Sequence, residues 1–527
     1  MIRFITNRED HNVTLPSGTI EQCVEHISKL DIIGLDTENS SLFPHHAVPL
    51  LLQLGNEDIT WVIDTTSVDI SFLNQFKDYY FLGQNLKYDY EILKAQFNIE
   101  LRNLKDLMLI EQTLGMGAKR KNSLDAIIER RLGTKATYQK STRNEFINAN
   151  SRFIFEDRHI IYAADDIKYL RPIYNIDMVL VDKFDMRFVL EEIEFPLIPI
   201  LGDCELEGMN LNREQWEQNI LDNTRLKYEL EQKLDEELKR LGEGKETLSG
   251  GKFSRTRKKI PQVIQTGLWG DTEIEVKNKA NINYGSPQQI KDIFTRLGKD
   301  VPVDKNGKES IGTEILQQYK QDPKNKDVVY FISLLLKYSE VCQQIDAFGK
   351  DHLNMISPKT GKIHTIYRQC STVTGRFQSG NSKAGFFNSQ QIPKDNKYRT
   401  CFYSEGYNIL TIDLASAELV ILAALSEDKK LVELQKEDIH SYLATVAYNK
   451  LIRSYKRRII ENGGLTSIFD VEELQELLSG KASDEKLSET DIELIILDLM
   501  TDRPFTISKK EHKWLRDRFK SVVYGLA

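Results

Sequence analysis

Four carboxylates in the first third of the chain have types and spacing that suit a metal-dependent phosphodiester site. Asp36 and Glu38 lie two residues apart at the end of a predicted strand, so both project from one face. Asp89 follows another strand at the start of a helix, and Asp166 lies on a helix one turn after Tyr162. With no Cys or His in these motifs, the set favours the hard cations Mg²⁺ or Mn²⁺. Two such ions about 4 Å apart activate a water and stabilise the leaving oxygen of a phosphodiester.

The elements that would position these carboxylates are strands followed by helices. Short runs of β-branched and aromatic residues, bounded by Asn, Asp and Gly, predict strands near 31–36, 50–54, 59–63 and 80–83. Helical segments interleave with them from residue 71 onward. This order predicts an α/β domain that ends near residue 180.

The section that follows is predicted to be almost entirely helical. One helix face is predicted from leucines at intervals of three or four residues: Leu226, Leu230, Leu234, Leu238 and Leu241. Asn212 with Gln215 is typical of a helix start, and so is Ser286 followed by Pro287 and Gln289. A second strand-bearing region is expected at about 350–425, around Tyr407–Asp413.

Further groups with chemical potential lie in the second half of the chain. Thr374-Gly375-Arg376 precedes Asn388–Pro393, and Asp413 precedes Glu418 where a predicted strand turns into a helix. His440 lies on another predicted helix, and a last helix carries Arg516, Lys520 and Tyr524 on one face. Two cations and a ring on one face suit a nucleoside triphosphate, because cations bind phosphates and the ring stacks. Taken singly, these groups are ordinary loops and solvated surface pairs.

In this collinear order the motifs resemble those of the family A DNA polymerases, the class of DNA polymerase I and of phage replicative enzymes. The first domain resembles DEDD 3′–5′ exonucleases of the subclass with a motif-three tyrosine. The resemblance implies an α/β plus α-rich fold: an RNase H-like exonuclease domain, a helical thumb and an incomplete right-hand palm and fingers. The implied boundaries are 1–183 for the exonuclease, 184–349 for the thumb, 350–425 for the N-terminal part of the palm and 426–527 for partial fingers with an insertion.

The resemblance also implies roles. The exonuclease metal ligands would be Asp36, Glu38, Asp89 and Asp166, with Tyr162 orienting the attacking water. Asp413 would be the first polymerase metal ligand, and Glu418 the steric gate that rejects a ribose 2′-OH. The triphosphate and DNA contacts would be His440, Arg516, Lys520 and Tyr524 for the nucleotide and Arg376 and Gln390 for the DNA. Two Mg²⁺ or Mn²⁺ ions per active site, a primer-template and dNTPs are the implied cofactors and partners.

Three departures from the family pattern affect the polymerase part. Leu414, Ala415 and Ser416 stand where the family usually has Tyr, Ser and Gln, and the gap from His440 to Arg516 is longer than usual. The family's second palm carboxylate comes from a His-Asp-Glu motif, which the 527 residues do not contain. Because one carboxylate cannot hold two metals, we expect the N-terminal portion of a split or truncated polymerase, completed by a second chain or joined after synthesis.

Composition limits the remaining classes of protein. The chain has 71 basic and 79 acidic residues, a net charge of −8 that is a weak guide when charges are segregated. No apolar run approaches the roughly 18 residues of a membrane span, and the start lacks a signal-peptide core. Five scattered cysteines without a CxxC pair argue against a zinc ribbon or a disulfide scaffold. We therefore expect a cytoplasmic enzyme, in the host cytoplasm if a phage encodes it.

Two alternatives remain open at this stage. One is a stand-alone DEDD 3′–5′ exonuclease acting on DNA or RNA, and the other is a DNA-binding replication subunit without polymerase activity. The joint presence of the chemical types at Asp413, Glu418, His440 and the Arg516–Tyr524 helix favours the polymerase with a proofreading exonuclease.

Overall fold

A computed structural model of the chain describes residues 1–116, 118, 120–136, 141–242, 282–304, 307–393, 395–414, 417–434, 441–442, 445–446 and 448–449. The chain divides into two compact units, Met1–Leu226 with Gln343–Ile409 and Lys227–Cys342 with Leu410–Ala527. Across the described residues, no helix combines the length and hydropathy that a membrane crossing requires.

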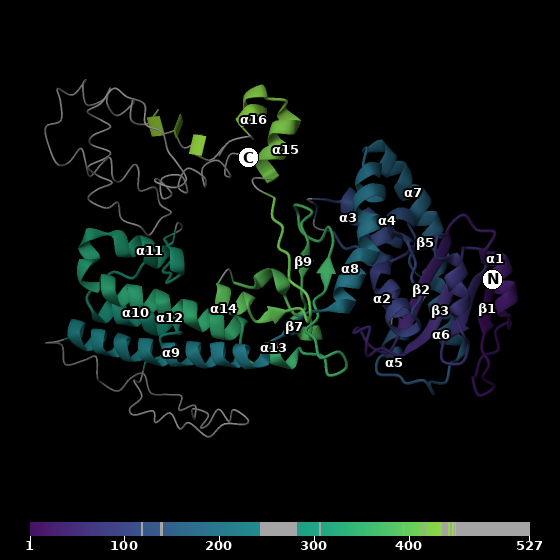
Figure 1. Cartoon of the computed structure of the whole chain (residues 1–527), viewed down its shortest axis with the longest axis horizontal. Helices are drawn as coiled ribbons and strands as arrows, with labels where there is room; N and C mark the ends of the chain where they lie inside the picture. The colour runs from purple at the N-terminus through teal and green to yellow at the C-terminus, as the bar shows by residue number, and fades with distance from the viewer. Residues whose placement is uncertain are drawn as a thin grey trace. The chain divides into compact units, whose positions relative to one another are not determined.

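A six-stranded mixed sheet forms the base of the first unit (Figure 1). In spatial order its strands are β1 (Ile2–Ile5), β4 (Thr60–Asp64), β3 (Pro49–Gly55), β2 (Ile33–Asn39), β5 (Tyr80–Gly83) and β6 (Asn103–Asp106). Only β3 runs antiparallel to its neighbours. The four predicted strands are confirmed as β2 to β5. Strands β1 and β6 were not predicted; β6 has a single apolar residue, Leu104, and so lacks the apolar run of a typical strand.

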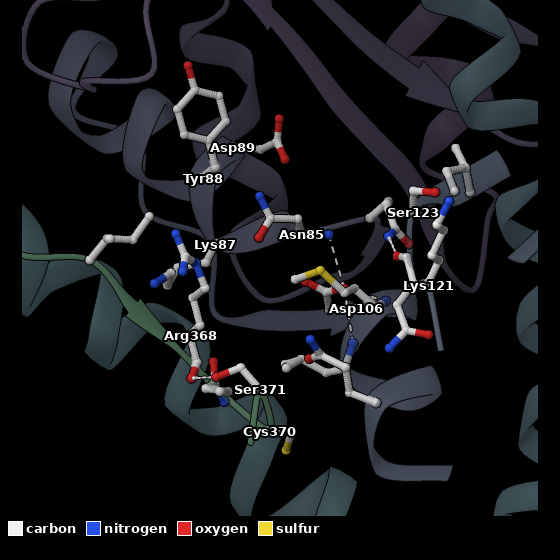
Figure 2. Close-up of a pocket in the computed structure, with 18 of the residues that line it drawn as sticks. Asn85, Lys87, Tyr88, Asp89, Asp106, Lys121, Ser123, Arg368, Cys370 and Ser371 are labelled. Atoms are coloured by element: carbon white, nitrogen blue, oxygen red, sulfur yellow. Dashed lines mark hydrogen bonds between the residues drawn. The ribbon is translucent and has the colours of Figure 1, made fainter. Parts of the chain in front are cut away.

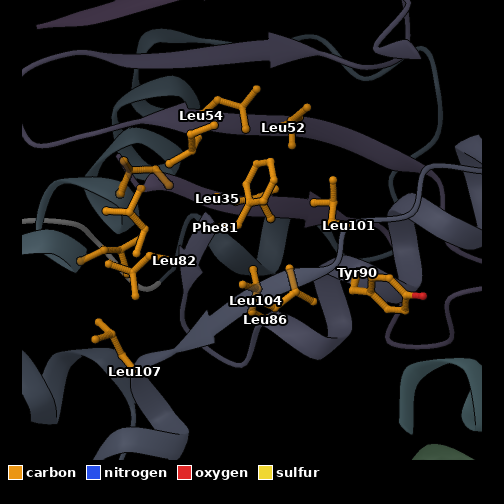
Figure 3. Close-up of a cluster of buried hydrophobic side chains, with 14 of the residues drawn as sticks. Leu35, Leu52, Leu54, Phe81, Leu82, Leu86, Tyr90, Leu101, Leu104 and Leu107 are labelled. Carbon is orange, nitrogen blue, oxygen red and sulfur yellow. The ribbon is translucent and has the colours of Figure 1, made fainter. Parts of the chain in front are cut away.

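Strand alternation divides the apolar side chains of this sheet between two hydrophobic clusters. Leu52 and Leu54 of β3 belong to the larger core with Leu35 (Figure 3). Leu51, between them in sequence, packs in a second cluster that includes Ile160.

The helices of this domain are α1 (Ile20–Ile27), α2 (Leu86–Phe97), α3 (Leu107–Leu114), α4 (Leu124–Leu132), α5 (Arg143–Phe146), α6 (Asp157–Lys168), α7 (Leu170–Lys183) and α8 (Phe195–Glu207). The predicted α/β domain is confirmed.

The first unit also contains a smaller core built around Trp216. Its indole is fully buried and packs edge-on against Phe348 and Tyr398. One short antiparallel ribbon and two short helices contribute to this core: β7 (Asn210–Leu211) with β10 (Phe402–Tyr403), α13 (Asp351–Asn354) and α14 (Asn396–Arg399). A second ribbon in the same unit pairs β8 (Tyr367–Arg368) with β9 (Gln378–Ser379). These ribbons place a second segment of the chain, residues 363–387, in the same unit as the exonuclease-like sheet.

The strand predicted around Tyr407–Asp413 is wrong. Residues 408–414 have neither helix nor strand, and Leu410 and Ile412 are 81% and 79% exposed. An alternating apolar pattern specifies a strand only where neighbouring strands can pair with it, and no described strand pairs with this segment.

The second unit is helical in its described part. Its helices include α10 (Pro287–Arg296), α11 (Thr313–Gln321), α15 (Ala417–Ser426) and α16 (Lys429–Leu434), while the boundary between the units falls within α9 (Arg213–Gly242) and α12 (Val329–Ala347). The predicted leucine face of α9 is confirmed, because Leu230, Leu234 and Leu238 are buried.

One of the two predicted helix caps forms as expected. Asn212 Oδ1 accepts the Gln215 N–H at 3.0 Å, which confirms the start of α9. Ser286 precedes α10, but its side chain makes no capping bond, and Gln289 Oε1 accepts the Asn283 N–H at 2.7 Å instead.

Candidate active site

The predicted carboxylates line a cavity of about 1340 Å³ in the first unit (Figure 2). Asp36 and Glu38 come from β2, Asp89 from α2, and Tyr162 and Asp166 from α6. Across from these elements, residues Ile366–Val373 around β8 form another wall. The structure therefore brings all five predicted exonuclease residues to one cavity, together with a segment that the sequence analysis did not connect with them.

Three of the carboxylates form a compact group. Ligand oxygens of Asp36, Glu38 and Asp166 lie within 4.8 Å of one another. This follows from strand alternation, since Asp36 and Glu38 face away from the core that contains Leu35 and toward the helix that carries Asp166. All the donors are hard oxygen atoms, so the group fits a divalent cation such as Mg²⁺ or Mn²⁺.

Asp89 lies in the same cavity but outside this group of three. It is 3% exposed, and its Oδ1 accepts a hydrogen bond from Thr37 Oγ1 at 2.5 Å. Thr37 lies between Asp36 and Glu38 on β2, so the bond ties the start of α2 to the strand that carries the other ligands.

Burial and mutual repulsion raise the pKa values of these acids. Desolvation raises the pKa of Asp36 to about 7. Burial, followed by the charges of Asp36 and Asp166, raises the pKa of Glu38 well above its usual range. Burial and the charge of Asp36 raise the pKa of Asp166 as well. Carboxylates that repel one another in this way favour a bound cation, which would neutralise them.

We expect the metal-free chain to show the cost of this repulsion as a pH-dependent stability. The folded state keeps the Asp36 proton up to pH 7, whereas the unfolded state releases it near pH 4. The difference in stability between wild type and Asp36→Asn should therefore be constant below pH 4. As the pH rises from 4 through 7, wild type should lose up to about 4 kcal/mol relative to the variant, at about 1.4 kcal/mol per pKa unit. Urea unfolding in EDTA between pH 4 and pH 8 measures the difference.

The matched control for this experiment is Asp78→Asn. Asp78 is 61% exposed, so its variant should differ from wild type by a constant amount over the same pH range. A constant difference for Asp36→Asn would contradict the raised pKa. Excess Mg²⁺ should reduce the pH dependence of wild type if the cation neutralises the group.

Tyr162 is positioned by packing. Its ring is 7% exposed and lies in the cluster with Phe146, at 6.2 Å between ring centroids. Burial and the charges of Glu38 and Asp166 raise the pKa of its hydroxyl, so the group stays protonated and can donate a hydrogen bond in the cavity.

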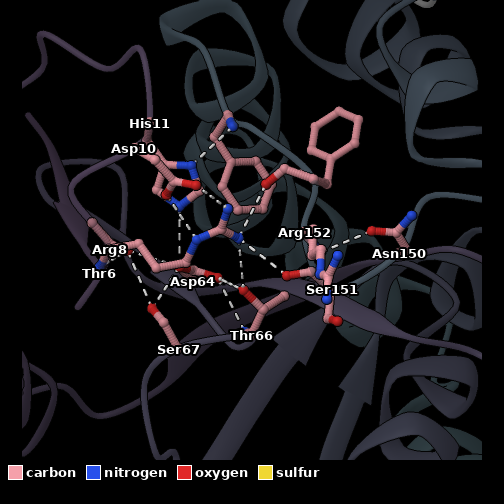
Figure 4. A network of polar contacts seen from close by, with 12 residues as sticks. Thr6, Arg8, Asp10, His11, Asp64, Thr66, Ser67, Asn150, Ser151 and Arg152 are labelled. Atoms are coloured by element: carbon pink, nitrogen blue, oxygen red, sulfur yellow. Dashed lines mark hydrogen bonds and ion pairs between the residues drawn. The ribbon is translucent and has the colours of Figure 1, made fainter.

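A polar network fixes the segment that leads into α6 (Figure 4). The buried Asp64 carboxylate accepts hydrogen bonds from Thr66 and Ser67, both at 2.6 Å, and contacts His11 at 3.2 Å. Arg8 extends the network by donating to the carbonyl oxygen of Ser151 at 3.1 Å. The network therefore attaches the segment before α6 to the end of β4.

Asp106 holds the loop that precedes Asp89. This carboxylate, 2% exposed, accepts the N–H groups of Asn85 at 3.0 Å and Leu86 at 2.7 Å, as well as that of Met108 at 2.7 Å in α3 (Figure 2). Asn85 has a left-handed backbone with φ of 61°, which asparagine tolerates better than most residues. One side chain thus sets the start of both α2 and α3.

Lys87 connects α2 with α8 and β8. Its ammonium contacts the Glu205 carboxylate and the Tyr367 carbonyl oxygen, and Glu205 also accepts the Tyr367 N–H at 2.6 Å. Gly202 allows α8 to lie this close to α2, since a Cβ there would come within 2.7 Å of the Tyr90 ring. The contacts fix β8 as a wall of the cavity.

Three residues of this site were not predicted from the sequence. Arg143 of α5 lines the cavity beside the carboxylates, and Lys87 and Asp106 position α2. Lys87 is adjacent to a recognised motif, which was an available signal. Arg143 and Asp106 lie in segments without a periodic pattern, and only the fold brings them to the site.

The predicted polymerase residues are placed only in part. In the first unit, Gly375 has φ of +75° in the loop next to Arg376, which is exposed, as is Gln390. Gln390 Nε2 donates to the Phe377 carbonyl oxygen at 3.1 Å. In the second unit, Asp413 is exposed and Glu418 lies in the first turn of α15. His440, Arg516, Lys520 and Tyr524 lie outside the described residues.

Two regions of the chain match known protein families. Residues 14–176 match the family described as 3′–5′ exonuclease, and residues 261–461 match DNA polymerase family A. The chain belongs to the family A DNA polymerases. The predicted family, with its 3′–5′ exonuclease domain, is confirmed.

Relatives of this family A chain include bacterial DNA polymerases I. That of Rhizobium leguminosarum is 27% identical over 378 residues, which cover 69% of this chain and 32% of the relative. That of Borreliella burgdorferi is 24% identical over 465 residues, covering 84% and 44%. The chain thus spans less than half the length of either relative.

A solved structure supports the predicted fold of the family A chain. It is described as the POL domain of Pol1 from M. smegmatis in complex with DNA primer-template and dNTP. The similarity has a TM-score of 0.56 at 16% identity and covers 97% of this chain and 76% of the other.

Proposed function

We propose that this chain hydrolyses DNA from its 3′ end, one nucleotide at a time. The observation that supports this most directly is the group of Asp36, Glu38 and Asp166, with ligand oxygens within 4.8 Å, beside Tyr162 in one cavity. This group lies in the part of the chain that matches the 3′–5′ exonuclease family.

The side chains around the carboxylates suit a polyanionic strand. Among the described residues, the cations that line the cavity are Lys87, Arg120, Lys121, Arg143 and Arg368. These cations can neutralise the negative charge of a DNA backbone that lies along the cavity beside the carboxylates. Because both walls of the cavity contribute, we propose that the strand end lies between the sheet domain and β8.

We assign the metal ligands as Asp36, Glu38, Asp89 and Asp166, holding two Mg²⁺ or Mn²⁺ ions. When bound, these ions supply an activated water and stabilise the charge that develops on the leaving oxygen. Tyr162 donates a hydrogen bond that orients the water, since its hydroxyl stays protonated. Thr37 and Asp106 keep Asp89 and the start of α2 in place.

Template-directed DNA synthesis is the second proposed activity. The match of residues 261–461 to DNA polymerase family A favours it. Asp413 would hold a metal, Glu418 would exclude a ribose 2′-OH, and His440, Arg516, Lys520 and Tyr524 would bind the dNTP. Arg376 and Gln390 would contact the primer-template. The exonuclease, thumb, palm and fingers would occupy 1–183, 184–349, 350–425 and 426–527, and we place the enzyme in the cytoplasm.

A primed-template assay tests both activities. With a 5′-labelled primer and Mg²⁺ but no dNTPs, we expect stepwise shortening that EDTA stops. With dNTPs, we expect template-directed extension of the primer, the activity that the match of residues 261–461 to DNA polymerase family A favours. An intact primer in Mg²⁺ would overturn the exonuclease proposal, and a primer that is not extended when dNTPs are present would overturn the polymerase proposal. An RNA oligonucleotide in the first reaction tests the stand-alone RNA exonuclease.

A further inference from the structure

Arg143 is a cation within the carboxylate end of the cavity. It is the first residue of α5 and lines the cavity together with Asp36, Glu38, Tyr162 and Asp166. Its positive charge opposes the effect of burial on the pKa values of Asp36, Glu38 and Asp166. The guanidinium therefore interacts electrostatically with all three members of the compact carboxylate group.

Contacts on the following residues of α5 hold Arg143 in this position. Phe146 is 1% exposed and packs in the same cluster as Tyr162. The Glu145 carboxylate contacts His159 Nε2 at 3.1 Å and also pairs with Arg158, and both partners belong to α6. These contacts fix α5 to the helix that carries Tyr162 and Asp166.

A second contact joins the residues after α5 to the end of β2, the strand that carries Asp36 and Glu38. The Asn148 N–H donates to the Ser40 carbonyl oxygen at 2.9 Å, immediately after β2. The segment that carries Arg143 is thus attached on both sides, to the strand of Asp36 and Glu38 and to the helix of Asp166. The Arg143 side chain itself is exposed, so these contacts position its backbone beside the carboxylates and leave the guanidinium accessible to a ligand.

The chemistry of this position indicates its ligand. A phosphodiester that approaches the carboxylates meets repulsion unless cations neutralise it. Arginine presents a planar fork of donors that matches the non-bridging oxygens of a phosphate. We propose that Arg143 is a catalytic residue that binds the non-bridging oxygens of the phosphate being cleaved. This inference rests on the proposed exonuclease function and adds a ligand to it.

The test compares two substrates that differ in the number of phosphates. One is a single-stranded DNA oligonucleotide, and the other is thymidine 5′-p-nitrophenyl phosphate, whose only phosphate is the one that is cleaved. Arg143→Gln should lower kcat/KM on both by a similar factor, about tenfold to a hundredfold, the range for hydrogen bonds to charged groups. Arg143→Lys, which keeps the charge but loses the fork, should recover part of the loss.

Product binding gives a readout that does not depend on turnover. Thymidine 5′-monophosphate carries the same phosphate, and its Kd in Mg²⁺ is measured by calorimetry. Arg143→Gln should raise this Kd about tenfold or more, and Arg143→Lys should raise it less. The matched control is Arg152→Gln, nine residues later, which is exposed and is not among the residues lining the cavity, and it should match wild type.

The outcomes separate this inference from the function on which it rests. A wild-type chain that leaves both substrates intact contradicts the exonuclease proposal. An active wild type with Arg143→Gln equal to it overturns only the role of Arg143. A loss confined to the oligonucleotide also overturns it, because Arg143 would then contact another phosphate of the strand. If Arg143→Gln has a lowered Tm, Arg143→Lys and the product Kd decide.

Discussion

Replacing Asp36 with alanine is expected to slow the removal of 3′-terminal nucleotides at least about a thousandfold. Asp36 is central to the electrostatics of the cavity, because its charge raises the pKa values of Glu38, Asp89 and Asp166. Without Asp36, the site would lose one of the four carboxylates that are proposed to bind the metal ions. Transition-state stabilisation by bound metal ions amounts to several kcal/mol, and each 1.4 kcal/mol changes the rate about tenfold. Gel analysis of a 5′-labelled oligonucleotide in Mg²⁺ measures the rate.

Stability separates this effect from a folding defect. Because Asp36→Ala removes a repelling charge from a buried acidic group, the metal-free variant should unfold at the same Tm as wild type or higher at pH 8. Asp78→Ala, at an exposed position of the same domain, should leave the rate unchanged. If Asp36→Ala degrades the oligonucleotide at the wild-type rate, the assigned site is wrong.

Asp106→Ala is expected to destabilise the first unit by about 3 kcal/mol or more. The substitution removes the acceptor for four N–H groups, those of Leu86 and Leu109 buried and those of Asn85 and Met108 partly buried. Loss of a helix cap costs about 1 kcal/mol, and each buried donor left without an acceptor costs about 1–3 kcal/mol. Urea unfolding followed by circular dichroism measures the change. Excision should also slow under conditions where the variant remains folded, because the start of α2 positions Asp89.

Two variants control for the chemistry of this substitution. Thr19 caps the exposed start of α1, so Thr19→Ala should cost only about 1 kcal/mol. Asp106→Asn keeps one carbonyl acceptor and should fall between wild type and Asp106→Ala. A loss for Asp106→Ala no larger than that for Thr19→Ala would mean that the four N–H groups find other acceptors.

The parts of the site that were predictable from sequence depend on local periodicity. Alternation along β2 was enough to place Asp36 and Glu38 on one face, and helix spacing placed Tyr162 and Asp166 together. Arg143 could not be found in this way, because it reaches the cavity through the burial of Phe146 and the bond from Asn148 to Ser40. Both contacts join segments that are far apart in the sequence.

Asp106 illustrates a second limit. Its role arises because the end of β6 lies beside the start of α2, some 20 residues earlier in the chain. A capping position for α3 is visible in the sequence, whereas the shared use of the same carboxylate by α2 is not. The strand predicted around Tyr407–Asp413 was wrong for the opposite reason. Its apolar alternation is visible locally, but a strand forms only where a neighbouring strand pairs with it.

Because β8 forms one wall of the cavity, the carboxylate site cannot be transferred to another protein with the sheet domain alone. Lys87 and Tyr367 are 280 positions apart, yet their contact helps to close the space around the carboxylates. A fragment that ends at residue 183 would keep Tyr162 and all four proposed metal ligands. Lys87 would lose its contact with Glu205, and the cavity would lose the wall formed by β8. On the proposed exonuclease function, residues 1–183 would therefore not be sufficient for activity. A fragment designed to keep this site intact should include α8 and β8.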